Sequence, residues 1–313
     1  MERSFLDTIE KAIERLSRHE RQPAPVAEAQ GTAAIVIEPA PLPAGPGSQP
    51  VRAETPAAPA VVRRTKRSVT LDLQRIRDAG MVVPDGNRSR IKEEYRHIKR
   101  PLLLNAAGKG AAVRPNQNVM MVSSSQPGEG KTFTSINLAL SIAAERDRTV
   151  LLVDADVLKP TVSRFFGVDN GPGLVDFLVD GQLDLSEVLV ETNVPSLVLL
   201  PAGNSHHLST ELLGSTAMRD LMTEMSNRYS DRVIIMDSPP LLATTEAAVL
   251  AHLVGQIIMV VEAERTRQSL VKEALALLDP DMAVGFVLNK SRQAARGDYY
   301  GPYYYSYAEP ARE

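Results

Sequence analysis

The chain has 313 residues, of which 43% are hydrophobic, enough for one large α/β domain with additional segments or for two small domains. Its formal net charge of -3 argues against nucleic-acid binding through broad neutralisation of phosphates. Cysteine is absent, which excludes disulfides, thiol catalysis and cysteine-ligated metals and fits a reducing compartment.

The first predicted element is a short helix within residues 1–20. Phe5, Ile9, Ile13 and Leu16 recur at helical spacing, with charged residues between them. Such an amphipathic helix either packs on its own domain or docks on another protein or a membrane surface. The segment lacks the apolar core of a signal peptide, and no apolar run in the chain approaches the roughly 18–20 residues of a membrane span. We therefore expect a cytoplasmic protein whose membrane association depends on a partner.

A flexible linker is predicted for residues 21–67. Residues 21–60 contain nine of the 22 prolines, interspersed with alanine and glycine, and such a segment buries too little apolar surface to offset its ordering entropy. The basic residues Arg63, Arg64, Lys66 and Arg67 end it. They favour a solvated charged patch, with attraction to anionic lipid as the alternative.

A folded domain is predicted for residues 68–292, where short apolar strands alternate with helical patterns. The predicted strands are 118–123, 149–153, 196–200, 232–236, 256–261 and 283–288, and the longer helices are 131–145, 209–227 and 266–278. This alternation is typical of an α/β fold with a mainly parallel sheet covered by helices on both faces. Ligands of such folds bind at the carboxyl ends of the strands.

A phosphate-binding loop follows the first of these strands. The segment Ser125-Gln-Pro-Gly-Glu-Gly-Lys-Thr132 has the layout of a P-loop, with serine in place of the first glycine. Gly128 and Gly130 let backbone N–H groups turn toward phosphate oxygens. Lys131 would reach the β and γ phosphates of ATP, and the Thr132 hydroxyl would bind Mg²⁺. The helix that follows adds a partial positive charge.

Carboxylates follow two further strands. Asp154 and Asp156 end one of them, and Asp237 ends another in the manner of a Walker B strand. Beside a P-loop, such carboxylates hold magnesium or its waters, or accept a proton from a nucleophile. Helix capping is the alternative for either strand taken alone.

Six of the eight tyrosines lie in the tail, residues 293–313, a placement too biased for core packing. They are Tyr299, Tyr300, Tyr303, Tyr304, Tyr305 and Tyr307. A cluster of phosphoacceptors and a self-associating segment are the two interpretations of this tail.

Together, SSSQPGEGKT, LLVDAD, IIMDSPP and the tyrosine tail resemble the bacterial tyrosine kinases, a P-loop family with the deviant Walker A fold of the Min proteins. Residues 88–104, which contain EEYRHIKR, resemble the family's oligomerisation helix. The resemblance covers roughly residues 88–307. With the N-terminal helix and the proline-rich linker it is closest to the tyrosine autokinases of exosortase-associated exopolysaccharide loci.

The resemblance implies a role for each matching residue. Lys131, Asp154 and Asp156 are the implied catalytic residues, with Asp154 as the base for the tyrosine hydroxyl, and the implied Mg²⁺ ligands are Thr132, Asp156 and Asp237. The implied ATP-binding residues are Ser125, Gln126, Pro127, Gly128, Glu129, Gly130, Lys131, Thr132, Phe133 and Asn289. The implied subunit contacts are Glu93, Arg96 and Lys99.

The resemblance also implies partners: a homo-oligomeric ring, a separate membrane activator of the polysaccharide-copolymerase class and a phosphotyrosine phosphatase, with no nucleic acid. Two positions depart from the family pattern. Leu158, followed by Lys159, occupies the place of an arginine beyond the second aspartate. Lys99 replaces the last arginine of the ring motif and lacks its bidentate fork.

Two rival functions remain open from the sequence. A Min/Par-type ATPase switch shares the fold, but its signature lysine near the start of the loop is absent, because Gln126 and Pro127 follow Ser125. A nucleotide-binding regulatory scaffold is the second rival, and the complete set of loop lysine and aspartates argues against it. Outside these motifs, Glu262 and Glu264 are expected to be solvated loop acids and Tyr95 an interface or core residue.

Overall fold

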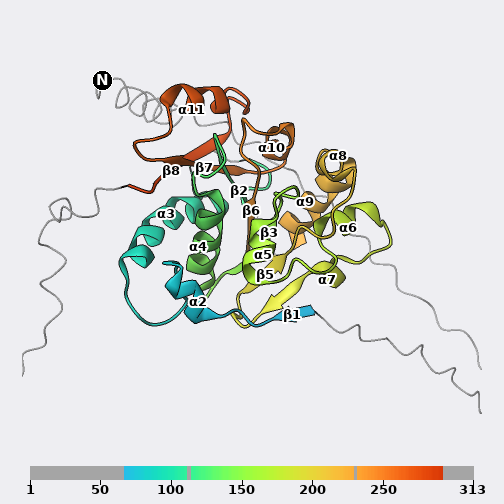
Figure 1. Cartoon of the computed structure of the whole chain (residues 1–313), viewed down its shortest axis with the longest axis horizontal. Helices are drawn as coiled ribbons and strands as arrows, with labels where there is room; N and C mark the ends of the chain where they lie inside the picture. The colour runs from blue at the N-terminus through green and yellow to red at the C-terminus, as the bar shows by residue number, and fades with distance from the viewer. Residues whose placement is uncertain (1–66, 111–113, 229–230, 292–313) are drawn as a thin grey trace, which may run out of the picture. The chain divides into compact units, whose positions relative to one another are not determined.

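The computed structural model describes residues 67–110, 114–228 and 231–291 (Figure 1). The predicted N-terminal helix, the linker up to residue 66 and the tyrosine tail lie outside the described residues. No helix in the described ranges is long and apolar enough to cross a membrane.

The core of the fold is an eight-stranded sheet with the order β1-β4-β5-β3-β6-β2-β7-β8. All neighbouring strands pair in parallel except β4 and β5, which are antiparallel. The strands are β1 (Arg67–Val69), β2 (Val119–Ser124), β3 (Thr149–Asp154), β4 (Val190–Thr192), β5 (Leu197–Leu200), β6 (Arg232–Asp237), β7 (Gln256–Glu262) and β8 (Ala283–Asn289). The parallel sheet predicted from the apolar runs is thereby confirmed.

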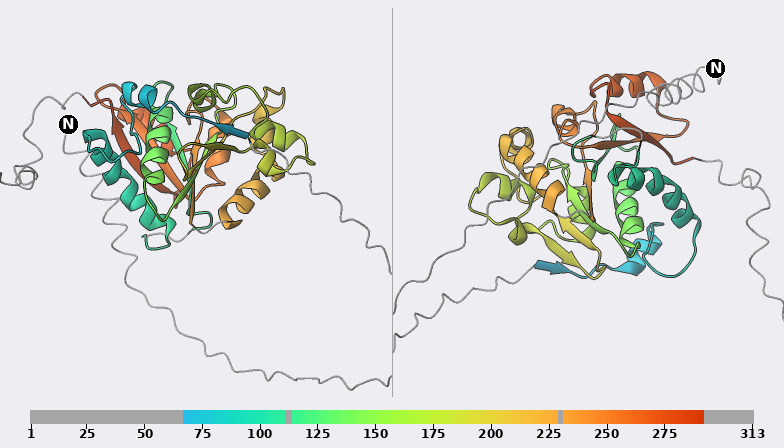
Figure 2. Two further views of the ribbon diagram at one scale, coloured as in Figure 1. Left: turned by 90° about the horizontal axis from the view of Figure 1, so that it is seen from below. Right: turned by 180° about the vertical axis from the view of Figure 1, so that it is seen from behind.

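Helices cover both faces of this sheet, as predicted (Figures 1 and 2). One face packs against α2 (Leu73–Asp78), α3 (Arg90–Ala106), α4 (Lys131–Ala143) and α5 (Thr161–Phe166). The other face packs against α6 (Leu174–Val179), α7 (Leu185–Val188), α8 (Ser209–Leu213), α9 (Thr216–Arg228), α10 (Thr245–Ala251) and α11 (Gln268–Leu275).

The side chains of the central strands divide between the two cores, one on each face of the sheet. Met120 and Val122 of β2 belong to the core beneath α3 and α4, whereas Val119 and Met121 belong to the opposite core. Successive side chains of a strand point to opposite faces, so a continuous apolar run fills both layers. The strands could therefore be predicted from the sequence although apolar and polar residues do not alternate along them.

The helix predicted over 209–227 is corrected to two helices, α8 and α9. The helix is interrupted at Gly214 and Ser215. The Ser215 hydroxyl accepts a hydrogen bond from the Met218 N–H at 3.1 Å. A serine that bonds three residues ahead starts a new helix, because it satisfies an amide that lacks a helical partner. The short strands β1 and β4 were not predicted, and β1 places Arg67 in the domain instead of the linker.

Candidate active site

The P-loop connects β2 to α4, and its conformation depends on two glycines. Gly128 and Gly130 have φ angles of 87° and 100°, a left-handed region that residues with a side chain rarely adopt. A Cβ atom on Gly130 would lie 2.0 Å from Nδ2 of Asn289. The left-handed turn therefore favours glycine at position 130, and a Cβ there would also displace the Asn289 amide at the end of β8.

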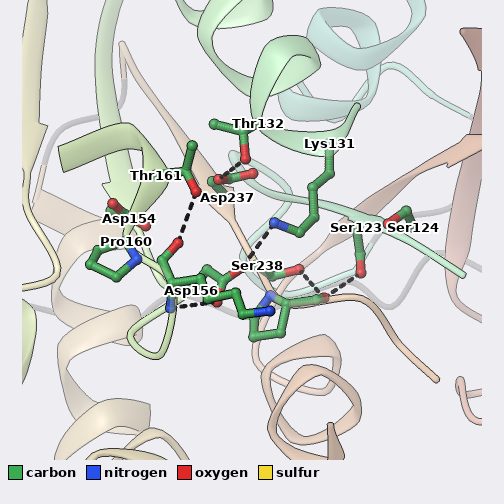
Figure 3. A network of polar contacts seen from close by, with 12 residues as sticks. Ser123, Ser124, Lys131, Thr132, Asp154, Asp156, Pro160, Thr161, Asp237 and Ser238 are labelled. Atoms are coloured by element: carbon green, nitrogen blue, oxygen red, sulfur yellow. Dashed lines mark hydrogen bonds and ion pairs between the residues drawn. The ribbon is translucent and has the colours of Figure 1, made fainter. Parts of the chain in front are cut away.

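Lys131, the first residue of α4, directs its ammonium group at Asp156 (Figure 3). Its Nζ lies 2.8 Å from Oδ2 of Asp156, and both side chains are largely buried. Burial alone would lower the pKa of Lys131, but the negative charges of Asp237, Asp156 and Asp154 outweigh it and raise that pKa. The lysine is thus held as a cation at the carboxyl edge of the sheet.

Asp237, the last residue of β6, accepts two hydrogen bonds from α4. The Thr132 hydroxyl donates to its Oδ2 at 2.7 Å and the Ser135 hydroxyl to its Oδ1 at 2.9 Å. Burial raises the pKa of Asp237 to about 6, although the Lys131 charge and these two hydroxyls act against the shift. The P-loop helix and the Walker B strand are thereby connected directly.

Asp154 ends β3 and is paired in register with Asp237 on the neighbouring strand. Its Oδ2 accepts hydrogen bonds from the N–H and the hydroxyl of Ser163, at 2.8 and 2.7 Å, whereas Oδ1 is buried without a hydrogen-bond partner. Burial, reinforced by the charge of Asp237, raises the pKa of Asp154 to about 7. A carboxylate of this kind can exchange a proton near neutral pH.

The donor set around Thr132 suits magnesium bound together with phosphates. Within residues 67–110, 114–228 and 231–291, no three His, Cys, Asp or Glu side chains are grouped closely enough to hold a metal by themselves. Mg²⁺ in nucleotide sites commonly uses one or two protein oxygens, several waters and the phosphates of the substrate. The Thr132 hydroxyl and the Asp237 carboxylate in contact with it meet that requirement.

The remaining predicted ATP-binding residues line the loop. Gln126, Pro127 and Gly128 are exposed, Ser125 is buried and Phe133 is half-buried. Glu129 is buried, and its carboxylate accepts hydrogen bonds from the Gln126 N–H, at 2.8 Å, and from the hydroxyl of Thr266.

Asn289, the last of the implied ATP-binding residues, uses its Nδ2 to donate to the carbonyl of Glu129 at 2.9 Å. Four residues missed in the sequence also contact the site: Ser135, Ser163, Thr266 and Lys290. None stands in a motif. Only the position of Lys290, directly after a strand that ends beside the loop, could have indicated it.

The predicted subunit contacts on α3 separate into two groups. Arg96 is exposed and Glu93 partly exposed, and the two form an ion pair with each other at 2.6 Å. Lys99 is buried, donating to the Ser141 carbonyl at 2.6 Å and pairing with Glu145 at 2.8 Å, so its partners lie within its own chain. Tyr95 is a core residue, and burial raises its pKa to about 12.

A family model described as an AAA domain matches residues 117–273. The tyrosine-protein kinase CapB of Staphylococcus aureus is 30% identical over 227 residues, covering 72% of this chain and 94% of CapB. The tyrosine-protein kinase ptk of Acinetobacter johnsonii is 33% identical over 182 residues, covering 58% of this chain and 24% of ptk.

The chain therefore spans about a quarter of the length of ptk but nearly all of CapB. Among solved structures, the VpsO kinase domain superposes with a TM-score of 0.51 at 31% identity, covering 65% of this chain and all of that domain.

Proposed function

Because this chain belongs to the bacterial tyrosine-protein kinase family, we propose that it transfers the γ-phosphate of ATP to the tyrosines between Tyr299 and Tyr307 of its own tail. The observation that carries the proposal is the meeting of a P-loop lysine with three strand-end carboxylates at one edge of the sheet (Figure 3). The tail supplies a dense set of acceptors.

Lys131 binds the triphosphate in this mechanism. Its ammonium pairs with Asp156, and an incoming β or γ phosphate replaces that carboxylate as its partner. Phosphoryl transfer requires little covalent help from the protein, since positioning and charge neutralisation supply most of the rate. Thr132 and Asp237 hold Mg²⁺, which when bound neutralises charge on the phosphate oxygens.

Asp154 acts as the base for the incoming tyrosine. A tyrosine hydroxyl has a pKa near 10, and the carboxylate of Asp154, with a pKa raised to about 7, accepts its proton as the new bond forms. Ser163 fixes the orientation of one carboxylate oxygen and leaves the other for the proton. Because Asp154 is fully buried, the residues that cover it must move when an acceptor tyrosine enters.

The acceptor tail is presented by a neighbouring copy of the chain in this proposal. A ring of subunits places each tail beside another subunit's site, and the phosphates added to it repel one another and the acidic edge. A membrane protein of the polysaccharide-copolymerase class recruits and activates the kinase, a phosphotyrosine phosphatase resets it, and the cycle regulates exopolysaccharide export. The kinase names of CapB and ptk support the reaction, and these partners are carried over from the family.

The test is incubation of the purified chain with ATP and magnesium, followed by mapping of phosphorylated residues by mass spectrometry. We expect phosphate on the tail tyrosines, none on the buried Tyr95, and none anywhere in a Lys131→Met variant. Absence of tail phosphate even with an activator fragment present would favour the ATPase switch. Tail phosphate that appears only with another kinase would favour the scaffold.

A further inference from the structure

Two side chains from the end of β8 bind consecutive carbonyl groups of the P-loop. Asn289 donates to the carbonyl of Glu129 at 2.9 Å, and the ammonium of Lys290 lies 2.6 Å from the carbonyl of Gly128. The loop is thus held from outside by residues about 160 positions later in the chain.

The direction of these carbonyls decides where the loop points its N–H groups. The carbonyl of one residue and the N–H of the next lie on opposite sides of a planar trans peptide. Holding the carbonyls of Gly128 and Glu129 toward β8 therefore turns the N–H groups of Glu129 and Gly130 the other way. Inward-facing N–H groups are what a P-loop uses to bind phosphate oxygens.

The backbone of Lys290 is itself in an uncommon conformation. Its φ is 57°, and Glu264, in the loop that follows the neighbouring strand β7, has a φ of 61°. Left-handed backbone at a residue with a side chain is uncommon and often marks a functional position. Here it accompanies contacts with the P-loop from both loops, because Thr266 bonds the carboxylate of Glu129.

The ammonium of Lys290 is fixed by a second partner. It lies 3.0 Å from the Glu262 carboxylate at the end of β7. The Lys290 side chain is 45% exposed, and its two acceptors together favour the arrangement in which the ammonium contacts the loop through a carbonyl. Lys131, by contrast, begins the helix and pairs with Asp156. The two lysines therefore have separate places in the site.

We propose that Lys290 is a positioning residue that, with Asn289, holds the P-loop carbonyls so that its N–H groups face the phosphates of a nucleotide. The proposal rests on the proposed function in that this loop binds nucleotide. It adds that the loop requires a cation at position 290, which lies outside the P-loop motif.

The test compares Lys290→Met and Lys290→Arg with Lys272→Met, a control at an exposed lysine of α11. Backbone order of the Glu129 and Gly130 amides is measured by ¹⁵N relaxation without added nucleotide, and Mg-ADP affinity by calorimetry. In Lys290→Met we expect order parameters to fall from about 0.85 toward 0.6. We expect ADP affinity to weaken about tenfold, the loss of one charge-assisted hydrogen bond. Lys290→Arg should retain most of the loop order and of the ADP affinity, and Lys272→Met should leave the two quantities unchanged.

The two measurements separate the possible outcomes. Weaker ADP binding with an unchanged loop would mean that Lys290 contacts nucleotide directly, and it would overturn the positioning role. A looser loop with unchanged ADP affinity would overturn it as well, as would no change in either. If the unaltered chain binds no nucleotide, the proposed function fails, whereas the relaxation measurement still reports on the loop. Asn289→Ala gives a second variant, expected to loosen chiefly Gly130.

Discussion

The carboxyl edge of the sheet and helix α3 both carry charged residues at regular spacing, but their side chains behave differently. At the sheet edge, Lys131 and the three aspartates lie together in one buried network. On α3, Glu93 and Arg96 pair at the surface while Lys99 turns into the protein. Motif spacing therefore locates side chains well where the backbone fixes them and poorly where a long side chain has a choice of partners.

The geometry of the two elements accounts for this difference. Asp154 and Asp237 are register partners on adjacent parallel strands, so their relative position follows from the pairing of the backbones. On a helix with 3.6 residues per turn, residues three apart shift by about 60°, so Lys99 lies about 120° around the helix from Glu93. That rotation brings Lys99 to α4, which packs beside α3 (Figure 2).

The strongest test of the sheet edge is Asp154→Asn. The asparagine keeps the size of the side chain but cannot accept the tyrosine proton, so we expect the rate of tail phosphorylation to fall about 100- to 10,000-fold. Initial rates of phosphate incorporation at saturating ATP measure the effect. Asp169→Asn, the same change at an exposed position, serves as the control. A comparable rate in both variants would remove Asp154 from the mechanism.

The same carboxylate makes stability depend on pH. The pKa of Asp154 is raised from 3.8 to about 7 by burial, so its protonated form is favoured in the folded state. Its stabilising contribution is complete below about pH 4 and is lost as pH rises through about 7. Between about pH 4 and pH 8, we expect the free energy of unfolding of the unaltered protein to fall by at most about 4 kcal/mol relative to that of Asp154→Asn. One pKa unit corresponds to about 1.4 kcal/mol.

Urea denaturation with chelator and without nucleotide measures this difference. Asp237, Asp156 and Lys131 are present in both proteins, so their own titrations largely cancel in the comparison. Parallel curves for the two proteins between pH 4 and 8 would show that Asp154 ionises at its ordinary pKa.

The sequence predicted the central strands to within about a residue because each is a largely continuous apolar run. It predicted that Asp154 and Asp237 would lie beside the P-loop for the same reason, although their roles stay predictions. It could not give the contacts of Ser163 or Lys290, because these depend on tertiary packing between segments distant in the chain. The boundary between α8 and α9 was missed because the helical spacing of apolar residues continues across Gly214 and Ser215, where the structure ends one helix and begins the next.

For helix α3, the first test is Lys99→Met. Methionine keeps most of the apolar stem but leaves the Ser141 carbonyl without its buried donor. We expect a loss of about 1–3 kcal/mol in the free energy of unfolding, measured in urea. Lys109→Met changes an exposed lysine and should leave that free energy unaltered. If Lys99→Met instead keeps full stability and alters only subunit assembly, Lys99 acts between chains after all.

Arg96→Ala should have the smallest effect on stability. The Arg96 and Glu93 side chains are 59% and 45% exposed, and such pairs contribute less than about 0.5 kcal/mol. If α3 forms subunit contacts, the same variant shifts the sedimentation coefficient toward the monomer although its fold is unchanged. Arg90→Ala is a matched control, because Arg90 pairs with Glu94 on the same helix with 67% and 51% exposure. Dissociation by Arg96→Ala alone would assign this surface to assembly, whereas no shift in either variant would leave α3 as a packing helix only.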